Sequence, residues 1–264
     1  MLSTYLFAFA LALGAGLSTA IGGLVVLRKK EPTALFLATA LGFSAGVMLW
    51  VSFLEILPES LDNLQQRFGE RPGAWLATLA FFGGVLLIGV IDRLVPEPVN
   101  PHTPQTTEAL GVSTQAFRKM GVMMALAIGI HNFPEGFATF LSGMESLKIA
   151  LPIAVAIGIH NIPEGISVAV PIWQATGSRW KGFKWAAITG LAEPLGALVG
   201  FAVLLPFLGP VTMGVAFGII AGIMVFISLD ELLPTAVATG KHHGAVYGLI
   251  AGMAVMALSL LLFM

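Results

Sequence analysis

Long stretches without a charged side chain recur along the chain, and each is long enough to cross a membrane as a helix. A helix that spans the hydrocarbon core of a bilayer needs about 20 apolar residues. The pattern predicts eight such helices, at about residues 3–27, 33–57, 74–94, 119–143, 147–172, 183–205, 210–235 and 244–263. We therefore expect an all-α polytopic membrane protein with eight transmembrane helices.

The basic residues of the predicted loops favour one orientation in the membrane. Cytoplasmic loops carry an excess of Lys and Arg, and only Arg67, Arg71 and Lys148 fall in outer loops if the N-terminus is outside. The other ten of the 13 basic residues then lie in inner loops, so the N- and C-termini are predicted to be outside. Residues 95–117 are rich in Pro and Thr, which is typical of a flexible loop, and this loop is predicted to be cytoplasmic. The remaining loops are short, so residues 1–264 are expected to form a single transmembrane domain.

The composition narrows the class of protein. Hydrophobic residues make up 57% of the 264 residues and charged residues 10%. Soluble domains carry about 25% charged residues, so a water-soluble globular protein is excluded. The net charge of −1 excludes the strongly basic surface that nucleic-acid binding needs. The chain has no cysteine, so disulfides and thiolate metal ligands are excluded as well. The lipid bilayer is an expected partner, and nucleic acid is not.

Two internal repeats join helices that are predicted to run in opposite directions. The decamer at residues 127–136 recurs at 156–165 with nine of ten positions identical, and residues 41–60 align with 217–236 with eight of twenty identical. Inverted repeats of this kind characterise secondary transporters, whose substrate site lies near the membrane midplane where the repeats meet. The alternative interpretation is a duplicated helix hairpin that serves only to build a stable bundle.

The repeated decamer carries polar side chains in the middle of two predicted spans. His131 and Asn132 precede Glu135 by four and three residues, so all three side chains share one helix face. Their counterparts in the second copy have the same spacing. A charged carboxylate at this depth costs roughly 2.5–3.5 kcal/mol, and no Lys or Arg lies within these spans to neutralise it. The carboxylates are therefore either protonated or meet a cation.

The types of ligand atom indicate which cation fits. Imidazole nitrogen with amide and carboxylate oxygen suits a borderline divalent ion such as Zn²⁺, Fe²⁺, Mn²⁺ or Co²⁺. The candidate metal ligands are His131, Asn132, Glu135, His160, Asn161, Glu164 and Glu193. Their three carboxylates are enough for two adjacent ions, although Glu193 alone could instead be a protonated packing residue. Acids nearer the ends of two helices, Glu55, Glu59, Asp230 and Glu231, are predicted to line the path of the ion or to be solvated at the interface.

These motifs resemble the ZIP (Zrt/Irt-like) family of divalent metal transporters, and most closely its bacterial ZupT-like branch. The matching segments are His131-Asn-Phe-Pro-Glu-Gly136, His160-Asn-Ile-Pro-Glu-Gly165, Gly190-Leu-Ala-Glu193 and Ser228-Leu-Asp-Glu-Leu-Leu-Pro234. The resemblance implies import of Zn²⁺, with Fe²⁺, Mn²⁺, Co²⁺ or Cd²⁺ as further substrates, across the plasma (inner) membrane of a bacterium into the cytoplasm. The ions would be cargo and not cofactors of an enzyme, and a homodimer is left open.

The resemblance also implies how the parts are arranged. Helices 1–3 and 6–8 would form a 3+2+3 inverted-repeat bundle around a two-metal centre between helices 4 and 5. One ion would use His160 with bridging Glu135 and Glu164, with or without His131. The other would use Asn132, Asn161, Glu193 and the same two glutamates. Helices 1, 4, 5 and 6 would move against the other four like an elevator.

Two other functions stay open at this stage. An intramembrane zinc metalloprotease would use a metal and a general base, usually in a His-Glu-x-x-His string, which does not occur here. A proton-coupled solute carrier could use the same carboxylates, but it would not need two histidines at matching positions of the repeat.

Overall fold

The computed structural model describes residues 2–27, 33–94, 129, 132–144, 146–204, 207 and 209–263, and every regular element in these ranges is helical. The elements are α1 (Leu2–Gly23), η1 (Leu24–Leu27), α2 (Ala34–Val51), η2 (Ser52–Ile56), α3 (Leu57–Phe68), α4 (Glu70–Leu94), α6 (Leu147–Thr176), α7 (Arg179–Gly190), α8 (Ala192–Leu204), α9 (Pro210–Ile227), η5 (Ser228–Leu232), α10 (Leu233–Ala238) and α11 (His242–Phe263). Residues 132–144 form a further helical segment.

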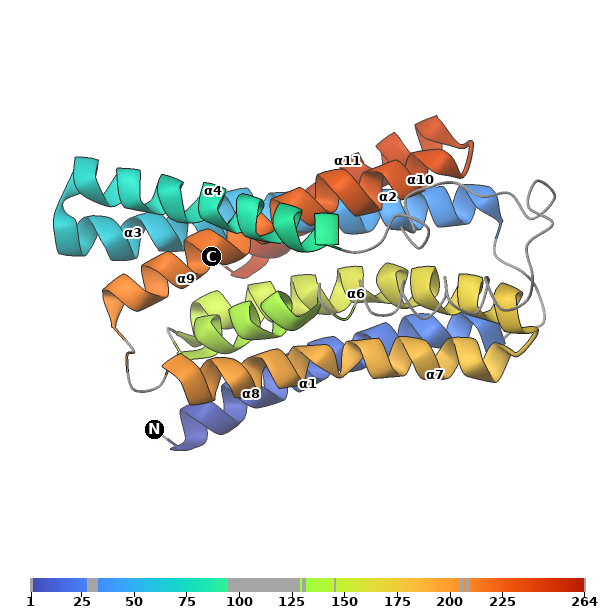
Figure 1. Cartoon of the computed structure of the whole chain (residues 1–264), viewed down its shortest axis with the longest axis horizontal. Helices are drawn as coiled ribbons and strands as arrows, with labels where there is room; N and C mark the ends of the chain where they lie inside the picture. The colour runs from blue at the N-terminus through green and yellow to red at the C-terminus, as the bar shows by residue number, and fades with distance from the viewer. Residues whose placement is uncertain are drawn as a thin grey trace.

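Seven helices of the described chain are long and apolar enough to cross a membrane. They are Thr4–Leu27, Ala34–Phe68, Glu70–Arg93, Ala150–Val170, Arg179–Val203, Pro210–Ala238 and His242–Leu261. The expected span at 119–143 is described only at residue 129 and from 132 onward, and the expected loop at 95–117 lies outside the described residues. Both chain ends lie toward the same end of the long axis (Figure 1).

Several helices are longer than the hydropathy pattern predicts. The helix expected at 33–57 continues through η2 and α3 to Phe68. Charged residues do not end it because α3 is amphipathic: Ser60, Asn63 and Leu64 are buried, while its other face carries the charges. The chain turns only at Gly69, whose φ of 87° lies in a region that glycine adopts without strain. Charged residues in the sequence therefore indicate where a helix leaves the apolar layer of the membrane, and the helix itself can continue beyond them.

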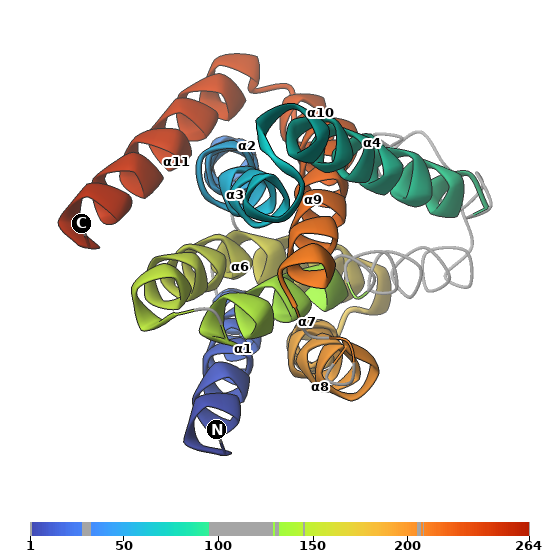
Figure 2. The same ribbon diagram turned by 90° about the vertical axis from the view of Figure 1, so that its left-hand side faces the viewer.

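The helices form two layers. Figure 1 shows α2, α3, α4, α9, α10 and α11 above and α1, α6, α7 and α8 below, and the end-on view of Figure 2 agrees. The upper layer is built on the pairs α2–α11 and α4–α9, the lower layer on α1–α6 and α6–α7, and α2 packs on α6 between them.

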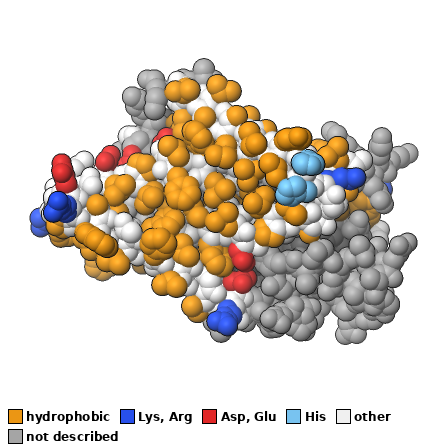
Figure 3. Space-filling model, turned by 90° about the horizontal axis from the view of Figure 1, so that it is seen from above, with side chains coloured by type: hydrophobic (Ala, Val, Ile, Leu, Met, Phe, Trp, Pro, Cys, Tyr) orange, Lys and Arg blue, Asp and Glu red, His pale blue; other side chains and the backbone are white. Residues whose placement is uncertain are grey.

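The outer surface fits a lipid environment. Seen from above, hydrophobic side chains cover most of the described surface, and charged side chains gather toward its edges (Figure 3). Large apolar side chains such as Trp75 and Leu86 of α4 and Leu258 of α11 are more than half exposed. Apolar surface of this extent is typical of a membrane-facing protein.

Glycine allows the helices within each layer to approach closely. A Cβ added at Gly16 of α1 would fall well inside 3.0 Å of the carbonyl oxygen of Gly190, and the converse holds for Gly190. In the upper layer, Gly46 of α2 meets the carbonyl of Leu249 in the same way. Among the described glycines, every approach closer than 3.0 Å is to a residue of the same layer. Close packing through small residues is how helices associate in lipid, so each layer is a tightly packed unit.

The weaker sequence repeat has a structural counterpart. The helix widens to a π-helical turn at Ser52–Ile56 and again at Ser228–Leu232, at the same offset of 176 residues. Each turn precedes a proline, which has no N–H for the normal helical bond. The hydroxyls of Ser52 and Ser228 both donate to the carbonyl four residues earlier at 2.7 Å. Since α2 and α9 run in opposite directions (Figure 1), the two copies are inverted.

Candidate metal centre

The polar residues of the repeated motif meet inside the lower layer. His160, Asn161 and Glu164 lie near the middle of α6, Asn132 and Glu135 lie on the segment 132–144, and Glu193 lies in the first turn of α8. All six side chains are almost fully buried, with at most 1% exposed. His131 lies outside the described residues. The structure therefore brings together six of the seven predicted ligands.

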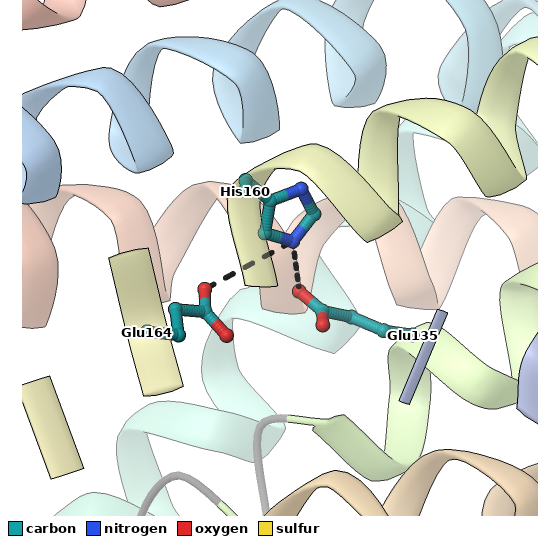
Figure 4. A group of neighbouring side chains, drawn as sticks. All are labelled: Glu135, His160 and Glu164. Atoms are coloured by element: carbon teal, nitrogen blue, oxygen red, sulfur yellow. Dashed lines mark hydrogen bonds and ion pairs between the residues drawn. The ribbon is translucent and has the colours of Figure 1, made fainter. Parts of the chain in front are cut away.

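One histidine and two glutamates converge on a common point (Figure 4). His160 Nε2 lies 3.1 Å from Glu135 Oε1 and 3.9 Å from Glu164 Oε1, and the three ligand atoms all lie within 4.8 Å of one another. His160 and Glu164 face the same way because they are four residues apart on α6. Glu135 arrives from the other copy of the motif, so the two copies face each other.

A hydrogen bond from the second ring nitrogen of His160 orients the imidazole ring. Nδ1 lies 3.0 Å from the carbonyl oxygen of Ala156, and a carbonyl only accepts, so Nδ1 carries the proton of this bond. In the neutral ring, the Nε2 lone pair is then available to a metal ion in front of the two carboxylates. A metal-binding histidine commonly donates its other N–H to a carbonyl in this manner.

The two asparagines of the motif bond to α1 and to residues near the break between α7 and α8. Asn161 donates through Nδ2 to the carbonyl of Ala15 at 2.9 Å and to Glu193 Oε1. Asn132 donates through Nδ2 to the carbonyl of Thr189 at 3.4 Å and to the hydroxyl of Thr19 at 3.5 Å. The Nδ2 atoms of both amide groups are thus bonded to residues of α1 and to Thr189 or Glu193, which lie on either side of the break between α7 and α8.

Several buried oxygens of the centre face no donor. Asn132 Oδ1, Glu135 Oε2, Asn161 Oδ1 and Glu193 Oε2 have no hydrogen-bond partner among the described residues. A buried polar atom without a partner costs about 1–3 kcal/mol. Carboxylate and amide oxygens are acceptors, so a nearby cation would satisfy such an atom, and an apolar or anionic group would not.

The break between α7 and α8 places Glu193 at the centre. The helix is interrupted at Leu191, and α8 starts again at Ala192. The first turn of a helix favours a carboxylate through the helix dipole. A Cβ at Gly136 would collide with the backbone of Glu193, so the glycine that ends the first motif lets segment 132–144 approach α8. Discontinuous helices of this kind mark the binding sites of many transporters.

The acids predicted along the ion path do not belong to this cluster. Glu55 lies in η2 and Glu59 in α3, while Asp230 and Glu231 lie in η5. Asp230 is exposed, and the other three side chains are partly exposed. Glu135, His160 and Glu164 form the metal-ligand cluster found among the described residues. The role of the other acids in a path stays a prediction.

Sequence reasoning missed two polar side chains that reach the centre, namely Thr19 of α1, which accepts from Asn132, and Ser44. Ser44 of α2 donates to Glu164 Oε1 at 3.2 Å from the opposite layer. It lies in an apolar run, at a position of the weaker repeat where the two copies differ, since its counterpart at the offset of 176 is Ile220. Only the packing of α2 on α6 reveals it.

Comparison with known proteins gives one consistent family. The sequence model of the family described as "ZIP Zinc transporter" matches residues 97–260. The chain is 62% identical over 263 residues to the "Zinc transporter ZupT" of Corynebacterium aurimucosum, covering 99% of each chain. The protein of that name from Streptococcus mutans is 54% identical, covering 99% of this chain and 100% of the relative. The one from Campylobacter jejuni is 48% identical, covering 96% and 95%.

Proposed function

The chain belongs to the ZIP zinc transporter family, and we propose on that premise that it imports divalent metal ions, Zn²⁺ foremost, through the buried centre. It is a multi-pass membrane protein of a bacterium. Its relatives are named transporters and not enzymes, so the ion is cargo and not a catalytic cofactor. The metalloprotease and solute-carrier alternatives gain no support from these relatives.

The cluster of His160, Glu135 and Glu164 is the observation that carries the proposal. Its ligand atoms lie within 4.8 Å of one another in a buried site, and none of the spans that supply them contains a Lys or Arg near the motif. A divalent ion would neutralise both carboxylates and use the Nε2 lone pair. Nitrogen and oxygen ligands at about 2.0–2.2 Å are typical of Zn²⁺, so a small inward movement of the three side chains would complete the site.

We assign a second ion to the adjacent oxygens. Asn132, Asn161 and Glu193 would hold it together with the two shared glutamates, as the unsatisfied oxygens suggest. His131 stays a predicted ligand of the first ion. Fe²⁺, Mn²⁺, Co²⁺ and Cd²⁺ are proposed as further substrates because the same donor set suits borderline ions.

The two layers supply the moving parts of the proposed transporter. The close glycine contacts hold α1, segment 132–144, α6, α7 and α8 together and leave the boundary with the upper layer free of such contacts in the described chain. This supports a movement of the lower layer against the upper one. Eight spans in a 3+2+3 arrangement, outside termini and a single domain over residues 1–264 complete the proposal. Glu55 and Glu59 would line one end of the path and Asp230 and Glu231 the other. A homodimer stays a prediction.

Uptake of zinc into proteoliposomes tests the function. We expect the wild-type protein to carry zinc to a trapped fluorescent indicator and the Glu135→Ala/Glu164→Ala variant to carry none. The matched control is Asp62→Ala/Glu70→Ala, which also removes two acids but from exposed positions, and it should transport normally. Competition by the other four ions would rank the substrates. Transport that survives the double substitution in the centre would overturn the site.

A further inference from the structure

Ser44 makes a hydrogen bond that the other buried serines of the described spans do not make. Ser52, Ser142 and Ser228 are all buried, and each donates to the carbonyl four residues earlier in its own helix, at 2.7–2.8 Å. The buried Ser60 of α3 donates at 2.6 Å to the backbone carbonyl of Gly214 in α9, a helix of the same layer. The hydroxyl of Ser44 lies instead 3.2 Å from Glu164 Oε1 and 3.4 Å from the carbonyl oxygen of His160. Both acceptors belong to α6, which α2 contacts from the opposite layer.

The hydroxyl has one proton and therefore one bond to donate at a time. Glu164 Oε1 is the nearer acceptor, and a hydrogen bond to a carboxylate is stronger than one to a neutral carbonyl. The same oxygen, Oε1, is the one that lies 3.9 Å from His160 Nε2. The serine thus holds the oxygen that faces the proposed ion.

We propose that Ser44 is a positioning residue for Glu164, supplied by the opposite layer, so that the site has its full affinity only while α2 and α6 are in this register. The other described side chains of the centre all belong to the lower layer, on α1, α6, α8 or segment 132–144. Movement of the lower layer along α2 would break the hydrogen bond between Ser44 and Glu164 and lower the affinity of the site for the ion. This inference rests on the proposed function, because it assigns Ser44 to the same site.

The test is zinc binding and uptake by Ser44→Ala. Loss of a group that orients a metal ligand costs about 10–100-fold in metal affinity, so we expect the dissociation constant and the KM for uptake to rise about 10-fold or more. The maximal rate should change little. Ser142→Ala is the control, since it also removes one buried hydroxyl that bonds only within its helix, and it should bind zinc as the wild type does.

A double-mutant cycle shows whether Ser44 acts through Glu164. If it does, Ser44→Ala should have no further effect on zinc affinity in a Glu164→Ala background. Unchanged affinity in Ser44→Ala, or a lower melting temperature and maximal rate with unchanged affinity, would overturn the inference. Equal effects of Ser44→Ala in both backgrounds would also overturn it. Failure of the wild-type protein to bind or carry zinc would overturn the proposed function itself, which separates the two outcomes.

Discussion

Two glycines of α1 that lie two residues apart should respond to alanine in opposite ways. Gly14 is exposed and has nothing within 4 Å of an added Cβ. Gly16 is buried, and its added Cβ would fall well inside 3.0 Å of the Gly190 carbonyl oxygen and 3.2 Å from Pro194 Cδ. Ordinary contact begins at 3.4 Å, so Gly16→Ala must push α1 and α7 apart by more than 0.4 Å.

The difference between the two variants isolates the cost of that displacement. Both gain about 1 kcal/mol of helix propensity from glycine to alanine, and this gain cancels in the comparison. Overpacking of a close contact costs about 1–3 kcal/mol, so Gly16→Ala should be less stable than Gly14→Ala by that amount. The displacement also moves the neighbouring Ala15 carbonyl, which accepts from Asn161, so the zinc affinity of Gly16→Ala should fall.

Thermal melting of the purified proteins, followed by tryptophan fluorescence, measures the first effect, and zinc titration measures the second. We expect Gly14→Ala to melt at or above the wild-type temperature and to bind zinc normally, and Gly16→Ala to melt lower and bind zinc more weakly. Equal melting temperatures and affinities in the two variants would refute the close approach of α1 and α7 and its link to the centre.

Two further predictions compare residues of the metal centre with each other and with glycine contacts of the upper layer. Glu164→Gln should slow zinc uptake more than Asn161→Ala, because the glutamate is an anionic ligand shared by both proposed ions, and equal fluxes would contradict this order. In the upper layer, Gly84→Ala should be less stable than Gly83→Ala, since only Gly84 meets the Ile219 backbone. Its zinc affinity in detergent should nevertheless stay normal because the α4–α9 contact supplies no ligand, and a loss of affinity would count against separate layers.

The chemistry of the centre was predictable because it depends on short-range spacing. His160 and Glu164 share a helix face through their separation of four residues, and the nearly identical copies of the decamer indicated a second set of ligands. The pairing of Glu135 with His160 across two helices was implied by the family resemblance. Buried acids without basic partners are costly in a membrane, which is why these residues stood out from the apolar background.

The features that sequence reasoning missed depend on how helices cross. Ser44 looks like any serine in an apolar helix, and only the contact between α2 and α6 gives its hydroxyl an acceptor on Glu164. The charge pattern predicts an end near residue 57 for the second span, but α3 stays helical beyond these charges to Phe68 because its charged face can leave the apolar layer. The π-helical turns at Ser52–Ile56 and Ser228–Leu232 were visible in sequence only as a weak repeat with proline.

Anomalous diffraction at the zinc absorption edge, from crystals grown with zinc, tests the central claim most directly. We expect a strong peak inside the lower layer at bonding distance, about 2.0–2.2 Å, from His160 Nε2 and from the carboxylates of Glu135 and Glu164. The peak should vanish in Glu135→Ala/Glu164→Ala. Zinc peaks confined to the surface, for example at the exposed His242 and His243, with none among the buried carboxylates, would contradict it.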